Sequence, residues 1–117
     1  MVFGALKDDS EIDLQLNTEL VEVAKEHDLK TVFHRAFDFT NNPFKALEQI
    51  IELGFDRLLT SGQEPKAIEG INLLRELRRQ ADGRIEIMAG SGVNSENVEE
   101  LIATGIEAVH FLSLIHI

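Results

Sequence analysis

The hydrophobic residues of the chain alternate between two spacings. Five short runs in which apolar residues predominate occur at residues 2–6, 29–33, 57–60, 85–89 and 108–111. Runs of this length, bounded by polar residues and glycines, are typical of buried strands. Between the runs, apolar residues recur every three or four positions, as they do along one face of a helix. The pattern predicts five strands that alternate with four helices.

Capping residues indicate where the four helices begin and end. An N-cap side chain accepts a hydrogen bond from the first turn, proline fits the first helical position, and glycine adopts the left-handed conformation that ends many helices. By these signals the helices are expected to begin at Asp13, Pro43, Glu64-Pro65 and Asn94 or Ser95. The last three are expected to end at Gly54, Gly83 and Gly105.

The order of elements predicts an α/β fold with parallel strands, because each connection contains a whole helix. The strands begin roughly every 23 to 28 residues, which is about the length of one βα unit. An open doubly wound sheet would need a switch point, and nothing in the chain marks one. Five strands cannot close an eight-stranded barrel, which usually takes ~250 residues. We therefore predict a partial (β/α)₈ barrel of about five parallel strands and four helices, covering residues 1–111.

Both ends of such a partial barrel have consequences. Residues 112–117 read Leu-Ser-Leu-Ile-His-Ile, which resembles a translated adapter sequence and predicts a non-native tail. The alternative is an apolar segment that continues the last strand. An unfinished barrel also leaves two unpaired sheet edges, so self-association through these edges is expected. A further alternative is an incomplete product without activity.

The charge and composition exclude several classes of protein. Acidic residues outnumber basic ones by 21 to 11, giving a net charge of −10. Such a chain repels nucleic acid and anionic membranes. It lacks a long apolar segment and a signal-peptide pattern, so a cytoplasmic protein is expected. With no cysteine, it can form neither disulfides nor thiolate metal sites.

The first candidate for chemistry is the segment 34–38, because ligands of barrel proteins bind where strands end. His34, Arg35 and Asp38 supply a base, a permanent cation and a carboxylate. We expect Arg35 to face the barrel mouth, because a guanidinium is costly in the dry layer between strand and helix. His34 is either a structural or a functional histidine, and His34 and Asp38 are the candidate acid–base residues. Arg35 and Asp38 bind a ligand or, alternatively, form an ion pair that braces the loop.

Two loops after later strands are candidate anion-binding segments. Thr60, Ser61 and Gly62 offer hydroxyl and N–H groups just before a helix, where an oxyanion is favoured. The alternative is a plain turn in which Ser61 bonds the backbone. The second loop, 90–92, contains two glycines that let the backbone approach a ligand, and its candidate residues are Gly90, Ser91 and Gly92. A tight turn that needs positive φ is the alternative there.

Other polar or metal-ligating residues lie within the predicted strands. Strand alternation places Glu86 and Met88 on the barrel interior, where the carboxylate would need a partner such as Arg57 or Arg35. His34 and His110, with Met88, are candidate metal ligands, although three separate strands give no diagnostic spacing. The alternative is that His110 is a core histidine.

Five segments together carry a resemblance to a known family. In this order and at these spacings, the chain is similar to the CutC-type copper homeostasis family in the segments 2–6, 33–38 (Phe-His-Arg-Ala-Phe-Asp), 59–63 (Leu-Thr-Ser-Gly-Gln), 87–93 and 107–110. The resemblance implies a cytoplasmic TIM barrel associated with copper. It also implies that this chain runs from the fourth strand to the eighth, without the cysteines proposed as copper ligands in the family.

Two functions follow as hypotheses. The first is copper homeostasis, with copper bound in the full-length protein mainly by residues outside this chain. The second is a barrel enzyme or sensor that binds a small anionic or phosphorylated ligand at the mouth, through Arg35, Ser61 and the glycines of the 90–92 loop. The sequence assigns no reaction to either.

Overall fold

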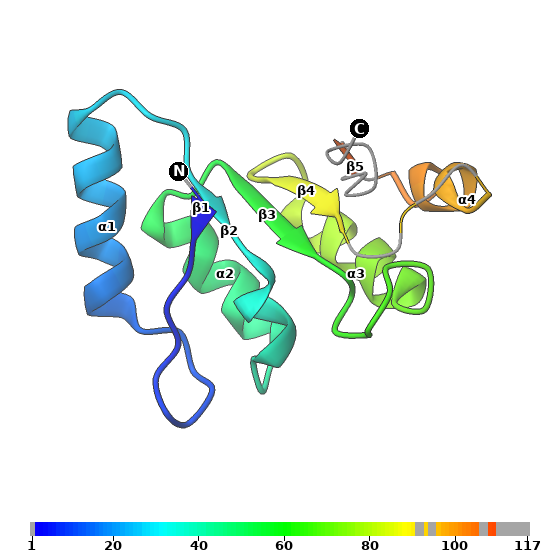
Figure 1. The fold of residues 1–117 in the computed structure, drawn as a ribbon, viewed down its shortest axis with the longest axis horizontal. Helices are drawn as coiled ribbons and strands as arrows, with labels where there is room; N and C mark the ends of the chain where they lie inside the picture. The colour runs from blue at the N-terminus through cyan, green and yellow to red at the C-terminus, as the bar shows by residue number, and fades with distance from the viewer. Residues whose placement is uncertain (1, 91–92, 94–95, 106–107, 110–117) are drawn as a thin grey trace, which may run out of the picture.

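A computed structural model describes residues 2–90, 93, 96–105 and 108–109 of the chain. Its five strands form one parallel sheet in the order β1-β2-β3-β4-β5 (Figure 1). The strands are β1 (Val2–Phe3), β2 (Val32–Phe33), β3 (Arg57–Thr60), β4 (Glu86–Ala89) and β5 (Ala108–Val109). This confirms the predicted parallel sheet. Predictions for Ser91, Gly92, Asn94, Ser95, His110 and 112–117 fall outside the described residues.

The helices run across the molecule in the same order as the strands (Figure 1). They are α1 (Leu14–Glu26), α2 (Pro43–Leu53), α3 (Ile71–Ala81) and α4 (Val98–Ile102). A 3₁₀ helix, η1 (Arg35–Phe39), directly follows β2 and was not predicted. The β-α alternation of a partial barrel is therefore confirmed, with one extra turn of helix at the end of β2.

Local capping signals fix α1 and α2 as predicted. The Asp13 side chain accepts a hydrogen bond from the backbone N–H of Leu16 at 3.0 Å. The Asn42 side chain caps α2, whose first residue is Pro43. Gly54 ends α2 with a φ of 94°, a conformation that glycine adopts without steric cost.

The start predicted for α3 is wrong, because residues 62–70 form turns and the helix begins at Ile71. The chain doubles back there so closely that a Cβ on Gly62 would lie 2.3 Å from the carbonyl oxygen of Gly70. Asp82 caps the end of α3 with a φ of 46°, and the predicted Gly83 follows it with a φ of 81°. The late start of α3 arises from the close approach of two segments, which single capping residues do not report.

The core lies between the sheet and the helices. Leu58 of β3 and Ile87 of β4 are fully buried, together with Leu47 and Ile50 of α2 and Leu74 of α3. The opposite, inner face of the sheet is more open. Residues of β3 and β4 alternate between the two faces, so the half-buried residues Arg57, Leu59, Glu86 and Met88 lie on the inner face.

Candidate functional site

The predicted site residues gather where β2, β3 and β4 end. Because the strands are parallel, these ends meet at one edge of the sheet. The Arg35 guanidinium nitrogen Nη2 lies 3.0 Å from the Ser61 hydroxyl oxygen. Gly90 follows β4, and its N–H donates to the Thr60 carbonyl oxygen at 3.0 Å. The structure thus brings Arg35, Ser61 and Gly90 to the same edge.

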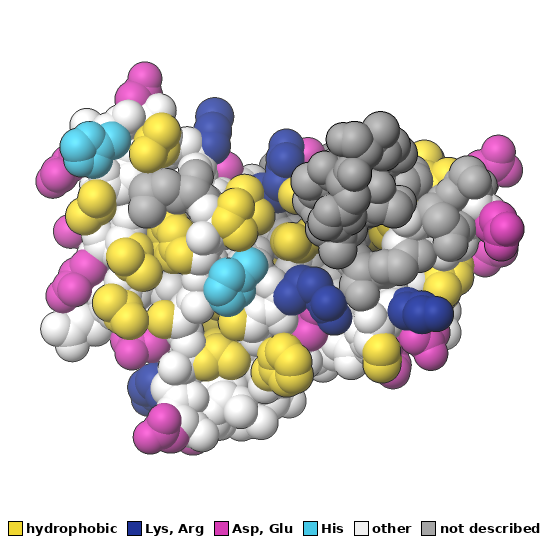
Figure 2. Space-filling model, viewed as in Figure 1, with side chains coloured by type: hydrophobic (Ala, Val, Ile, Leu, Met, Phe, Trp, Pro, Cys, Tyr) yellow, Lys and Arg dark blue, Asp and Glu magenta, His cyan; other side chains and the backbone are white. Residues whose placement is uncertain are grey.

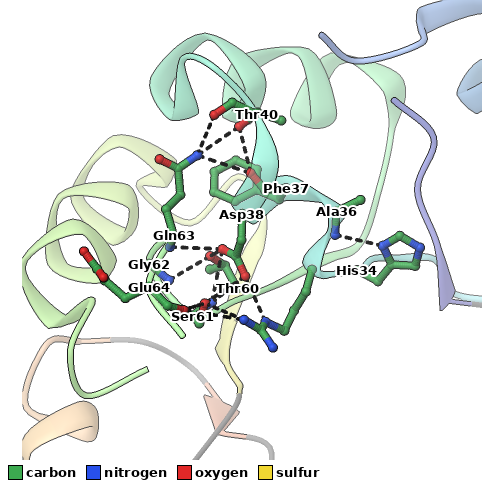
Figure 3. A network of polar contacts seen from close by, with 11 residues as sticks. His34, Ala36, Phe37, Asp38, Thr40, Thr60, Ser61, Gly62, Gln63 and Glu64 are labelled. Atoms are coloured by element: carbon green, nitrogen blue, oxygen red, sulfur yellow. Dashed lines mark hydrogen bonds and ion pairs between the residues drawn. The ribbon is translucent and has the colours of Figure 1, made fainter. Parts of the chain in front are cut away.

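The Asp38 carboxylate is the centre of this edge (Figure 3). Its Oδ1 accepts hydrogen bonds from the Thr60 hydroxyl at 2.5 Å and from the Gln63 N–H at 3.1 Å. Its Oδ2 accepts from Arg35 Nε at 2.9 Å, from the Ser61 N–H at 3.1 Å and from the Ser61 hydroxyl at 2.9 Å. We call these five residues, Arg35, Asp38, Thr60, Ser61 and Gln63, the rim cluster.

The rim cluster already uses the N–H groups that the sequence suggested for an external anion. The backbone N–H groups of Ser61 and Gln63 donate to Asp38, and that of Gly62 donates to the Thr60 hydroxyl oxygen at 3.0 Å. The Asp38 side chain is only 4% exposed. The anion bound by this loop is therefore the protein's own carboxylate. A second anion could reach these N–H groups only by displacing it.

Arg35 has a double role at the edge. It forms the ion pair with Asp38 that the sequence offered as one alternative. Its side chain is nevertheless 38% exposed. Strand β2 ends at Phe33, so the chain has already turned into η1 at Arg35, and strand alternation no longer sets the direction of this side chain.

His34 caps η1 and stands apart from the rim cluster (Figure 3). Its Nδ1 accepts a hydrogen bond from the backbone N–H of Ala36 at 3.1 Å. A backbone N–H can only donate, so Nδ1 carries no proton and the neutral ring carries its proton on Nε2. This contact is the structural role that the sequence offered as one of two alternatives for His34.

Gln63 completes the cluster; it belongs to the candidate segment 60–63 after the third strand, although the sequence assigned it no role of its own. Its amide nitrogen donates to the Thr40 carbonyl oxygen at 2.9 Å and to the Thr40 hydroxyl oxygen at 3.1 Å, tying η1 to the loop after β3. The backbone of Gln63 has a φ of 63°, unusual for a residue other than glycine. Its partner lies 23 residues earlier in the chain, so no local motif could reveal the contact.

Glu86 pairs with Arg57, one of the two partners that the sequence offered for it. Its carboxylate lies 3.0 Å from Arg57 Nη2 on the neighbouring strand β3. Both side chains lie at the starts of their strands, and they line a cavity of about 380 Å³ with Lys30, Thr31, Val32 and Asp56. This cavity and the rim cluster are therefore at opposite ends of the sheet.

The described residues do not form a metal site. Among residues 2–90, 93, 96–105 and 108–109, no three His, Cys, Asp or Glu residues come together in a way that could hold a metal ion. His34 directly follows β2 and Met88 lies in β4, two strands that are not adjacent in the sheet. The third predicted ligand, His110, lies outside the described residues. None of the described helices has the length and apolar character needed to cross a bilayer.

Comparison with known proteins gives consistent matches. Residues 1–115 match the CutC family. A CutC family protein of Treponema denticola is 45% identical over 115 residues, covering 97% of this chain and 46% of the relative. One of Bacteroides thetaiotaomicron is 50% identical over 112 residues, covering 95% and 44%. The chain thus spans less than half the length of these curated relatives.

Solved structures agree with the fold. A crystal structure of a CutC protein from Streptococcus agalactiae, whose name refers to copper homeostasis, has a TM-score of 0.85 and 34% identity. The match covers 93% of this chain and 53% of that one. A structure described as native KDPGal, 16% identical with a TM-score of 0.63, shows likeness of fold alone. The family match and the identities lead to one conclusion: the chain belongs to the CutC family.

Proposed function

We propose that this protein takes part in copper homeostasis, and that copper is held mainly by residues outside this chain. Family membership over residues 1–115 is the observation that carries the proposal. The name of the Streptococcus agalactiae relative refers to the same process. Copper is then the cargo of the full-length protein and not a resident cofactor.

The residues of the chain support the second half of the proposal. Copper(I) prefers thiolate and thioether ligands, and the chain has no cysteine and two methionines. Using His34 Nε2 as a ligand would require the ring proton to move to Nδ1, which accepts the N–H of Ala36. Loss of this cap would oppose metal binding. The described part of the chain is therefore better suited to form the barrel wall and its rim.

The rim cluster supplies rigidity at the end of the barrel where ligands bind. The buried Asp38 carboxylate joins η1 after β2 to the loop after β3, with contacts on both of its oxygens. A rigid rim of this kind holds neighbouring groups in place before a ligand arrives.

Binding of a small anion at the rim is the second candidate function. It is favoured by one observation, the 38% exposure of the Arg35 side chain, whose Nη1 has no acceptor among the described residues. The ligand would be held by Arg35, Ser61 and the backbone around Gly90 and Gly92. His34 or Asp38 would serve as acid or base in an enzyme of this kind.

Calorimetry separates these proposals. The test uses this chain and a hybrid in which the chain replaces the matched 112 residues of the Bacteroides thetaiotaomicron relative. We expect copper(I) to bind the hybrid and not the isolated chain. Tight binding by the isolated chain would show that the ligands lie within it, and absence of binding by a folded hybrid would refute the copper proposal.

Inorganic phosphate tests the second candidate in the same hybrid. Binding that is lost in Arg35→Ala, but kept in the control Arg75→Ala, would support an anion site at the rim. Arg75 is a suitable control because it lies on the exposed side of α3 and contacts only Asn72 at 3.5 Å among the hydrogen bonds identified for it. Absence of phosphate binding, or equal loss in both variants, would refute the second candidate.

A further inference from the structure

Helices α1 and α3 are each followed by an aspartate in the left-handed conformation. Asp28 has a φ of 56° and Asp82 has a φ of 46°. Both residues lie where a helix leads into the next strand, at the end of the sheet where the parallel strands begin (Figure 1). Their neighbours differ, because Leu29 follows the first aspartate and Gly83 follows the second. The two turns therefore allow a comparison of one residue type in one backbone conformation.

The turn after α3 leaves two adjacent groups unengaged. Asp82 and Gly83 are both exposed. Within the part of the chain that the structure describes, the Asp82 carboxylate accepts no hydrogen bond and forms no ion pair, and the Gly83 N–H donates no hydrogen bond. A Cβ built on Gly83 would meet no atom within 4 Å, so the peptide nitrogen is sterically open.

The turn after α1 holds the corresponding nitrogen. The Leu29 N–H donates to the Ala24 carbonyl oxygen at 2.9 Å. Asp28 itself is exposed, as Asp82 is. The two turns therefore differ at the nitrogen that follows the aspartate, which is bonded and next to a branched side chain in the first turn only.

Exposure alone does not single out Asp82. Acidic side chains are spread around the margin of the molecule in the space-filling view (Figure 2). Several aspartates are held by backbone N–H groups, namely Asp9, Asp13, Asp38 and Asp56. Asp82 combines a carboxylate outside such contacts with a glycine as the next residue.

We propose that Asp82 is a site of spontaneous backbone modification, the conversion to isoaspartate through a cyclic imide with Gly83. The Gly83 nitrogen attacks the Asp82 carboxyl carbon Cγ. The N–Cγ bond forms, and the carboxyl hydroxyl leaves with the amide proton as water. Water then adds to one of the two imide carbonyls, the C–N bond to that carbonyl breaks, and a proton passes to the nitrogen. Opening at Cγ restores aspartate, whereas opening at the main-chain carbonyl gives isoaspartate.

The reaction needs a local opening of the turn. Asp82 has a ψ of 44°, so its Cα–C bond must rotate before the Gly83 nitrogen can reach Cγ. The Arg84 N–H, which donates to the Ala81 carbonyl oxygen at 2.8 Å, opposes this rotation. Openings of exposed helix ends are among the least costly in a folded protein. At Asp28 the same rotation must also break the bond of the attacking nitrogen to Ala24.

The product changes the connection between α3 and β4. Isoaspartate adds one carbon atom to the main chain and leaves a carboxylate on Cα. Arg84, two residues further on, joins this turn to the Gln80 carbonyl oxygen at 2.8 Å and to Glu48 of α2 at 2.9 Å. Enzymes that transfer a methyl group from S-adenosylmethionine to isoaspartyl carboxylates are the partner class that fits this product. The inference goes beyond copper or anion binding and depends on neither.

Long incubation at neutral pH and physiological temperature tests the proposal. One sample of the chain is kept folded, as checked by circular dichroism, and a second sample is kept in urea. Isoaspartate is measured by enzymatic methylation with labelled S-adenosylmethionine and located by mass spectrometry of peptides. We expect it to accumulate at Asp82 in the folded chain, about tenfold faster than at Asp28. Absence of isoaspartate at Asp82 in the folded sample, when the urea sample forms it, would refute the proposal.

Leu29→Gly provides the matched control, because it places the same dipeptide in the turn whose nitrogen is hydrogen-bonded. In the folded variant we expect Asp82 to react about fivefold faster than Asp28, the effect of one backbone hydrogen bond, and in urea the rates should be equal. Equal rates in the folded variant would overturn the structural argument. Gly83→Ala gives a second test that does not need Leu29→Gly to fold. Its added methyl group meets no neighbouring atom but crowds the nitrogen, so an unchanged rate at Asp82 would also overturn the proposal.

Discussion

The rim cluster and the Arg57–Glu86 pair are two ways of joining neighbouring strands with charged side chains. The Asp38 carboxylate is 4% exposed and accepts from four residues, whereas Glu86 is 33% exposed and meets Arg57, itself 38% exposed. A carboxylate without access to water must receive all its hydrogen bonds from the protein. A half-exposed pair can exchange its partner for water at little cost. The comparison indicates that the rim is rigid and that the inner-face pair is easily replaced.

Removing the Asp38 carboxylate should lower the free energy of unfolding more than any other change considered below. Asp38→Ala leaves the buried Ser61 N–H and the Gln63 N–H without their acceptor, and we expect a loss of about 2–5 kcal/mol of unfolding free energy. Urea unfolding measures the loss. The control is Asp9→Ala, whose exposed carboxylate accepts from the Glu11 N–H, and it should cost less than about 1 kcal/mol. Equal losses in the two variants would show that the cluster is not rigid.

The elements with local signals could be predicted from the sequence. Asp13 caps α1, Pro43 opens α2 and Gly54 ends it, because each signal acts within one turn of the helix. Alternation along the strands placed Glu86 on the inner face and left Arg57 and Arg35 as its possible partners; the register of β3 with β4 selects Arg57. These features depend on spacings of a few residues or on a regular period.

The centre of the candidate site could be predicted only in part. The Arg35–Asp38 pair spans three residues and was one of two alternatives. The bonds from Thr60 and Gln63 to Asp38 span 22 and 25 residues, so they depend on how two loops meet at the sheet edge. The late start of α3 has a similar origin in the close approach of Gly62 and Gly70.

A double-mutant cycle on the inner-face pair sharpens the comparison. For Arg57→Ala, Glu86→Ala and the double variant, we expect a coupling energy of at most about 1 kcal/mol in the isolated chain. The reason is that water can replace either partner at this exposure. Urea unfolding at low and high salt provides the measurement. A coupling as large as the loss in Asp38→Ala would contradict the distinction between the two regions.

We expect the smallest effect on stability at a third ion pair, Glu48 with Arg84. These side chains are more exposed than those of the inner-face pair, at 43% and 47%. The hydrogen bond from Arg84 holds the pKa of Glu48 below its ordinary value of 4.5. Because the pKa is lower in the folded protein, the pair stabilises the fold above the ordinary value. This contribution is lost as the pH falls through the lowered pKa.

We compare the thermal midpoints of unfolding of the unchanged chain and of Glu48→Gln from about pH 6 to about pH 3. The difference between them reports this pair alone, because the other carboxylates titrate equally in both proteins. We expect a small gap near pH 6 that closes towards pH 3. A gap that stays constant would show that the charge of Glu48 does not contribute. If Glu48→Gln lowered the thermal midpoint near pH 6 as much as Asp38→Ala does, solvent exposure would not explain why the rim cluster contributes more stability than the exposed pairs.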